Sequence, residues 1–125
     1  NIKELIKNHR DSKKLATLTA VQPPGRFGAV KLDGKKVIDF HEKPQGENRL
    51  VSGGFFVLEP EVLNLIKDDK TSWEDEPIQK LVDTNNLNAY IHNGFWRPMD
   101  TLRDKRELNK LWNENKAPWK IWKDA

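Results

Sequence analysis

Three short stretches of this sequence hold residue types that can act together on a phosphorylated ligand. Glu42 and Lys43 form an acid–base pair directly after an apolar run, Gly53-Gly54 lies in a second apolar run, and Asp100 stands just before a predicted helix. A carboxylate can accept hydrogen bonds from sugar hydroxyls or hold a divalent metal ion, and a lysine can present its charge to a phosphate. Glycine main-chain amides can lie directly against a ligand. Together the stretches predict a site for a sugar phosphate and a metal ion.

Each pattern also has a structural explanation. Glu42 and Lys43 suit a solvated turn, Gly53-Gly54 suits tight packing or a bulge, and Asp100 suits a helix cap. Thr101 and Asp104, however, match a capping box, which leaves Asp100 available as a hard oxygen ligand for Mg²⁺. From the residues alone, both explanations stay open for all three stretches.

Other candidate chemistries receive less support from the sequence. Phe27-Gly28 places an aromatic ring, able to cover a sugar face, beside a glycine at a strand start, which alone is a weak signal. The three histidines lack metal-ligand spacing and there is no cysteine, so we expect no zinc site. No G-x-S-x-G pattern is present, so a nucleophile-type hydrolase has little support. No glycine-rich phosphate-binding loop precedes the three stretches, which favours the acceptor half of a transferase.

Composition narrows the class of protein further. The chain has 125 residues, 33% of them charged, with a net charge of +3, a pI of about 9.1 and a mean hydropathy of −0.83. Lysines are scattered among acidic residues, which is typical of a solvated surface rather than a nucleic-acid-binding stripe. No apolar run approaches the roughly 18 residues of a membrane span. We expect a cytoplasmic protein that binds neither nucleic acid nor membranes.

The elements that must position these residues alternate between strands and helices, which predicts an α/β fold with a mixed sheet and flanking helices. The alternating apolar pattern predicts strands over residues 15–21, 28–32, 36–40, 50–58 and 87–91, with Asp33-Gly34 as a hairpin turn. Helical spacing predicts helices over 2–10, 59–67, 74–83 and 101–113. A tryptophan-rich tail follows over 117–122, and if it is exposed it indicates a subunit contact in a homo-oligomer.

Five strings in this order closely resemble the glucose-1-phosphate cytidylyltransferases, a group within the sugar nucleotidyltransferases. They are ATLTAVQPPGRFG at 16–28, EKP at 42–44, GGFFVL at 53–58, GFWxPMDTLRD at 94–104 and KAPWK at 116–120. VQPPGRFG and WxPMDTLRD are specific to this group, whereas EKP and the Gly-Gly strand occur across the wider superfamily. The resemblance covers nearly the whole chain and implies a Rossmann-like nucleotidyltransferase fold. Residues 1–125 then form the C-terminal part of that domain: 1–99 the sugar-phosphate-binding portion, and 100–125 the terminal helix and tail.

The resemblance also implies an activity: CTP and α-D-glucose 1-phosphate give CDP-glucose and pyrophosphate with Mg²⁺, in support of bacterial surface polysaccharide synthesis. The family's glycine-rich triphosphate loop and first metal-binding aspartate are not in this sequence, so we expect a fragment that is inactive alone.

The resemblance implies a role for each matching residue. Glu42 would bind sugar hydroxyls, Lys43 the sugar phosphate, and Asp100 the metal. Smaller contacts fall to Gly28, which would offer its amide to the sugar, to Phe27 beside it, and to Gly53 in the sugar pocket. Ser52 departs from the asparagine of close relatives, and its shorter side chain weakens a nucleotide contact there.

Two alternatives remain. A uridylyl- or thymidylyltransferase relative would keep the same sugar site. A non-catalytic oligomerisation module would use the tryptophan-rich tail, although the catalytic strings would then be a coincidence.

Overall fold

The computed structural model describes residues 1–24, 28–42 and 50–124. The chain forms two compact units, each built from two segments. The first unit comprises Asn1–Gln22 and Arg49–His92, and the second comprises Pro23–Asn48 and Asn93–Ala125. The predicted division at residues 99 and 100 stays a prediction.

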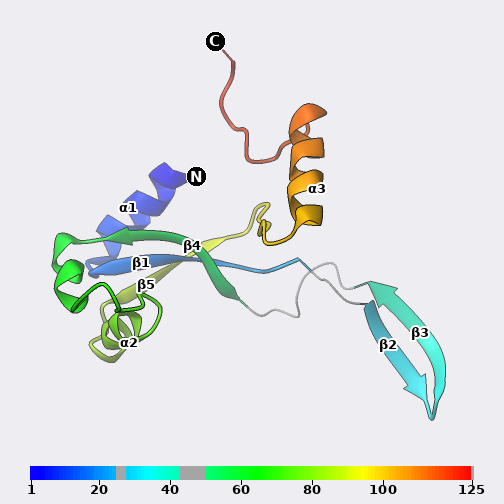
Figure 1. Ribbon diagram of the computed structural model, residues 1–125, viewed down its shortest axis with the longest axis horizontal. Coiled ribbons are helices and arrows are strands. Elements are labelled where there is room, and N and C mark those ends of the chain that lie inside the picture. The colour runs from blue at the N-terminus through cyan, green and yellow to red at the C-terminus, as the bar shows by residue number, and fades with distance from the viewer. Residues whose placement is uncertain (25–27, 43–49, 125) are drawn as a thin grey trace. The chain divides into compact units, whose positions relative to one another are not determined.

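The first unit is built on a mixed three-stranded sheet (Figure 1). Its central strand β1 (Ala16–Val21) pairs antiparallel with β4 (Val51–Leu58) and parallel with β5 (Leu87–His92). A parallel pair needs a long connection, and the one from β1 to β5 includes β4, which runs back antiparallel to β1, and two short helices between β4 and β5. The predicted mixed sheet with flanking helices is therefore confirmed.

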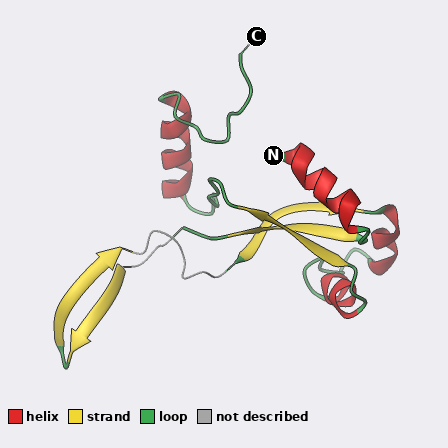
Figure 2. Cartoon of the chain, turned by 180° about the vertical axis from the view of Figure 1, so that it is seen from behind, coloured by secondary structure: helices red, strands yellow, loops and turns green. Residues whose placement is uncertain are grey.

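Helices cover the two faces of this sheet (Figure 2). The side chain of Thr17 contacts helix α1 (Ile2–Ser12), whereas its neighbour Ala16 packs into the core with Val62 and Leu81. Those two core residues come from the 3₁₀ helix η1 (Pro60–Leu65) and from α2 (Glu76–Asp83). Because successive strand residues point to opposite faces, α1 lies on one face and the η1–α2 pair on the other.

The two short helices differ from their predicted forms. The predicted helix over 59–67 is a six-residue 3₁₀ helix that ends when Ile66 becomes extended. A segment this short gains little from α-helical propagation, so the tighter form with i to i+3 hydrogen bonds is accessible. Helix α2 begins at Glu76 rather than residue 74, because Pro77 must lie in its first turn and a turn over Ser72–Asp75 precedes it.

The second unit contains a β-hairpin and a C-terminal helix. Strands β2 (Gly28–Asp33) and β3 (Lys36–Glu42) pair antiparallel, as predicted. The turn lies one residue later than predicted, at Gly34-Lys35, because Asp33 still pairs with Lys36 and Gly34 takes the left-handed φ of 60°. Helix α3 (Leu102–Asn113) carries the predicted capping box at its start.

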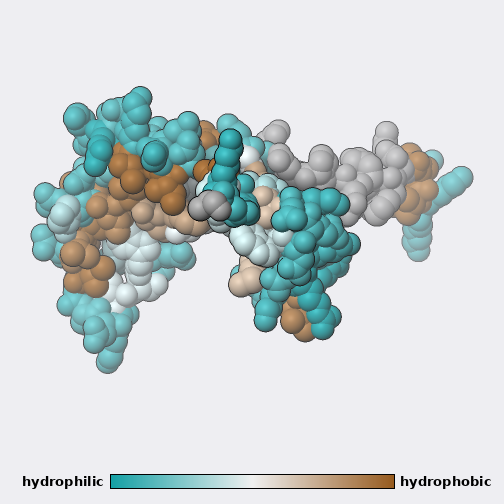
Figure 3. Space-filling view, turned by 90° about the horizontal axis from the view of Figure 1, so that it is seen from above, coloured by the Kyte–Doolittle hydropathy of each residue, from teal (hydrophilic) through white to brown (hydrophobic). Residues whose placement is uncertain are grey.

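The face seen from above is largely hydrophilic among the described residues but contains hydrophobic patches (Figure 3). In the tail, Ile121 is 77% exposed and Trp122 is 54% exposed. The sequence predicts a homo-oligomer contact here if the tail is exposed, and these two side chains are exposed. The contact itself stays a prediction. Among the described helices, none combines the length and apolar character that a bilayer crossing requires.

Candidate functional site

The Gly53-Gly54 pair forms a bulge in β4. Leu18 of β1 opposes Phe56, but Ala20 opposes Ser52, so β4 has two more residues than β1 across this interval. Gly54 has a φ of 85°, and a Cβ built on it would meet nothing within 4 Å. Glycine is therefore needed at position 54 for the backbone conformation and not for close packing, which removes the tight-packing explanation there.

Ser52 and Gly53, two of the residues that the sequence predicts to contact a ligand, lie at this bulge. Ser52 is exposed and its hydroxyl accepts a hydrogen bond from the main-chain N–H of Gly54 at 3.3 Å. The serine therefore stabilises the bulge locally. Bulges turn the strand and its side chains beside binding sites, so the position suits the predicted ligand contacts, which stay predictions.

The hairpin brings two predicted sugar-binding residues together. Gly28 at the start of β2 and Glu42 at the end of β3 are opposed in the strand register. Opposed residues of an antiparallel pair have Cα atoms about 4.5–5.5 Å apart, which lets both contact one sugar ring. Phe27 and Lys43, the adjoining predicted residues, lie outside the described part of the chain.

Asp100 lies just outside the first turn of α3, and another residue caps that helix. The hydroxyl of Thr101 accepts from the Asp104 main-chain N–H at 3.1 Å, and the Asp104 carboxylate accepts from the Thr101 N–H at 3.2 Å. The Asp100 carboxylate is exposed and has no hydrogen bond or ion pair with the described residues. The predicted capping box is confirmed, and the role of Asp100 as a metal ligand stays a prediction.

The donor chemistry at Asp100 fits a magnesium ion. No group of three or more His, Cys, Asp or Glu residues that could hold a metal occurs within residues 1–24, 28–42 and 50–124. Mg²⁺ is usually held by only one or two carboxylates together with substrate phosphates and water, unlike zinc, which takes a full protein ligand set. One free carboxylate at a helix start is therefore a sufficient protein contribution from this segment.

A buried polar network around His9 was not predicted from the sequence. His9 is 2% exposed, and its ring nitrogens contact Thr17 Oγ1 at 2.7 Å and Glu59 Oε1 at 2.8 Å. Asn88 Nδ2 donates to Thr17 Oγ1 at 3.2 Å and to Asn8 Oδ1 at 2.7 Å. The network links α1, β1, β5 and the end of β4, and its residues are too far apart in sequence for a local signal.

Among the described residues of the first unit, two ionisable groups have displaced pKa values. Partial burial raises the pKa of Tyr90 above 10.0, and a hydrogen bond to the Glu4 carboxylate at 3.1 Å adds to the shift. Lys67 lowers the pKa of Glu76 through a 2.8 Å hydrogen bond and its charge. Neither group belongs to the predicted site, and both shifts follow from surface pairs rather than catalytic tuning.

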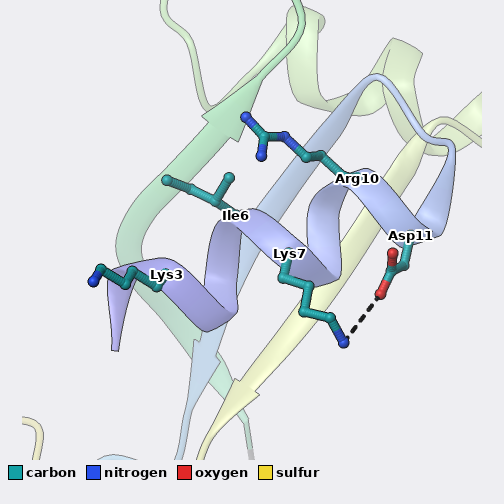
Figure 4. A pocket seen from close by; sticks show the side chains of 5 residues that line it. All are labelled: Lys3, Ile6, Lys7, Arg10 and Asp11. Atoms are coloured by element: carbon teal, nitrogen blue, oxygen red, sulfur yellow. Dashed lines mark ion pairs between the residues drawn. The ribbon is translucent and has the colours of Figure 1, made fainter.

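A shallow pocket of about 330 Å³ lies along α1, and none of the predicted site residues lines it. Figure 4 shows that its five lining side chains all come from this single helix: Lys3, Ile6, Lys7, Arg10 and Asp11. Lys7 and Asp11 pair with each other at 3.8 Å across one helical turn. The pocket is therefore the solvated face of a helix and contributes no convergent chemistry.

Comparison with known proteins gives one family. The model of the family described as nucleotidyl transferase matches residues 1–124. Glucose-1-phosphate cytidylyltransferases of Salmonella typhi and of Salmonella typhimurium are each 52% identical over 122 residues, covering 98% of this chain and 48% of the relative. The chain therefore spans about half the length of these curated relatives.

A solved structure supports the same fold. It is a provisionally named glucose-1-phosphate thymidylyltransferase from Bacillus anthracis, in complex with a sucrose. Its TM-score is 0.60 at 19% identity, and the match covers 98% of this chain and 51% of that one. At this identity the likeness establishes the nucleotidyltransferase fold alone.

Proposed function

The chain belongs to the nucleotidyl transferase family, and from that premise we propose that it is the sugar-phosphate- and metal-binding half of a glucose-1-phosphate cytidylyltransferase. The complete protein would convert CTP and α-D-glucose 1-phosphate into CDP-glucose and pyrophosphate. The observation that carries the proposal is the 52% identity to the Salmonella enzymes across 98% of this chain. Because the chain spans about half of those enzymes, it is not expected to turn over alone.

The reaction needs positioning more than covalent chemistry. A phosphate oxygen of glucose 1-phosphate attacks the α-phosphorus of CTP, the bond from that phosphorus to the bridging oxygen of the β-phosphate breaks, and pyrophosphate leaves with the electron pair. No enzyme-bound covalent intermediate forms. Two polyanions must approach each other, so the protein must orient them and offset their charge.

Each of the matching residues has one task in this scheme. Glu42 accepts hydrogen bonds from sugar hydroxyls, and Gly28, opposed to it in the hairpin, donates its main-chain N–H to the same sugar. Gly53 lines the sugar pocket, Phe27 covers the sugar beside Gly28, and Ser52 stands near the nucleotide.

The charged residues act on the phosphates. Lys43 binds the attacking phosphate and holds it in line. Asp100 would hold Mg²⁺, which when bound neutralises charge on the phosphates.

The decisive experiment measures pyrophosphate release by the complete protein, supplied with glucose 1-phosphate, Mg²⁺ and either CTP, UTP or dTTP. A strong preference for CTP supports the proposal. Turnover with UTP or dTTP instead would keep the sugar site but assign a sister activity. No turnover with any nucleotide would contradict a catalytic role and favour an interaction module built on the exposed tail.

The metal role is tested with Asp100→Asn. We expect kcat to fall by about a hundredfold or more, because a charge that helps stabilise the transition state is lost. The fold should be retained, since the Asp100 carboxylate is exposed and makes no hydrogen bond or ion pair with the described residues. Asp75→Asn is the matched control, because Asp75 is also an exposed carboxylate at a helix start whose side chain makes no capping hydrogen bond. Near-normal pyrophosphate release by Asp100→Asn would refute the metal role.

A further inference from the structure

The segment that carries Asp100 is tied to α3 by a group of charged side chains. Arg97, three residues before Asp100, donates through Nη2 to Glu107 Oε2 in the second turn of α3. The same nitrogen lies 3.9 Å from Asp104 Oδ1. These three side chains are 30%, 35% and 13% exposed, so the interaction is partly shielded from water. Arg97, Asp104 and Glu107 are called the Asp100 frame below.

Asp104 connects this frame directly to Asp100. While Oδ1 of Asp104 faces Arg97, its Oδ2 accepts hydrogen bonds from the main-chain N–H groups of Asp100 and Thr101, each at 3.2 Å. One carboxylate therefore holds the backbone of Asp100 with one oxygen and faces the guanidinium with the other. The position of the Asp100 main chain therefore depends on the Asp104 carboxylate, which itself faces the Arg97 guanidinium.

An aromatic contact anchors the other end of the segment. Phe95 packs against Trp119 with ring centroids 5.8 Å apart, and Trp119 stacks on Trp112 of α3 at 6.5 Å. The segment from Phe95 to Thr101 is therefore attached to α3 at both ends. Attachment at both ends leaves the backbone of Asp100, which lies within this segment, little freedom to move.

We propose that the Asp100 frame positions the Asp100 carboxylate for Mg²⁺, which makes Arg97 a positioning residue of the reaction. The inference rests on the proposed function, because it assumes the metal role of Asp100. Mg²⁺ demands near-ideal octahedral geometry, so a ligand on a loosened backbone binds it more weakly. Outer-shell partners of metal ligands typically change metal affinity by about 10–100-fold when they are mutated.

The sequence contains a matched control for Arg97. Arg103 also pairs with Glu107, through Oε1 at 3.1 Å, but it lies within α3 and its side chain is 84% exposed. Removing either arginine takes one cation from the same carboxylate. Only Arg97 lies on the segment that carries Asp100, so its removal takes one tie to α3 from that segment, and the two variants separate positioning from simple charge loss.

The test measures metal binding directly in the complete protein. Mn²⁺ replaces Mg²⁺ as a spectroscopic probe, and free Mn²⁺ is followed by electron paramagnetic resonance in the presence of a non-reacting CTP analogue. We expect Arg97→Ala to weaken Mn²⁺ binding by about tenfold or more, and Arg103→Ala by about twofold or less. Arg97→Lys should recover part of the loss, because the cation remains while the planar fork is gone.

Equal Mn²⁺ affinities for Arg97→Ala and Arg103→Ala would overturn the inference. If Arg97→Ala does not fold, Glu107→Gln decides, since the amide keeps the side-chain volume but loses the charge that holds Arg97. We expect Glu107→Gln to weaken Mn²⁺ binding severalfold, and an unchanged affinity would overturn the inference. Asp100→Asn distinguishes failure of the proposed function from failure of this inference. If Asp100→Asn binds Mn²⁺ as tightly as the wild type does, the metal role of Asp100 is wrong. If Asp100→Asn weakens Mn²⁺ binding but the Arg97 and Glu107 variants do not, only the positioning role of the Asp100 frame is wrong.

Discussion

Replacing Thr17 by valine should destabilise the protein by breaking the buried network around His9. Glu59 accepts from His9 Nε2 at 2.8 Å, and because a carboxylate only accepts, that nitrogen carries a proton. In the neutral ring the other nitrogen, Nδ1, must then accept from the Thr17 hydroxyl, 2.7 Å away. Valine keeps the shape of threonine but removes this donor.

The magnitude follows from which atoms lose their partners. His9 is 2% exposed, so its Nδ1 cannot be hydrated when the hydroxyl is removed. Leaving such a buried polar group unsatisfied costs about 1–3 kcal/mol. Asn88 also loses a contact with Thr17, but it keeps its 2.7 Å hydrogen bond to Asn8 and is partly exposed, so it adds little.

Thr19→Val is the matched control on the same strand. Thr19 is 7% exposed, and its hydroxyl has no hydrogen-bond partner within the described residues. Replacing an unpartnered buried hydroxyl by a methyl group should be neutral or stabilising, by up to about 1 kcal/mol. Threonine and valine both favour strands, so β-propensity does not account for a difference between the two variants.

The assay is equilibrium unfolding in urea, followed by tryptophan fluorescence and far-UV circular dichroism. With an m-value of about 2 kcal/mol per molar, a loss of about 2 kcal/mol lowers the midpoint by about 1 M urea. We expect this shift for Thr17→Val and none, or a small rise, for Thr19→Val. If Thr17→Val is no more destabilising than Thr19→Val, the hydroxyl does not hold His9 and the network described here is refuted.

Three further predictions follow from the other observations. Lys43→Ala should raise the KM for glucose 1-phosphate by about tenfold or more through loss of a charge-assisted contact, and an unchanged KM would exclude that contact. Tyr90, the single tyrosine of this chain, should ionise above pH 10.0 in an absorbance titration. Because the pKa of Tyr90 is raised in the folded protein, its contribution to folding stability is complete below pH 10.0 and is lost as the pH rises through the folded pKa. Glu4→Gln should lower the midpoint of the Tyr90 titration, and an unchanged midpoint would show that Glu4 does not contribute. Gly54→Ala should cost about 1–2 kcal/mol in urea unfolding through backbone strain alone, because a Cβ there meets nothing within 4 Å; an unchanged stability would mean that the bulge relaxes.

Sequence reasoning predicted local structure well where neighbouring residues determine it. The capping box at Thr101 and Asp104 was predicted and is present, because both of its hydrogen bonds join residues three positions apart. The hairpin was predicted with a turn one residue too early, since the glycine signal located the turn but cross-strand pairing decided whether Asp33 belongs to the strand.

The candidate site was predictable in part for the same reason. Gly28 and Glu42 fall at strand ends as expected, but only the register between β2 and β3 shows that they are opposed. Gly53-Gly54 suggested a bulge or a close approach, and the pairing of β4 with β1 distinguishes the two at Gly54. The tie between Arg97 and Glu107 crosses ten residues of loop and helix, so no helical periodicity could have indicated it.

The sequence by itself determined the family resemblance, the order of strands and helices and the availability of Asp100, because motifs, caps and apolar periodicity are properties of adjacent residues. Tertiary structure decided the features that join distant residues. His9 meets Glu59 across 50 positions, and that contact exists only because α1 packs on the sheet beside the end of β4. Similarly, the Asp100 frame forms because the segment before α3 folds back along that helix. Such contacts depend on packing geometry, which local sequence patterns do not encode.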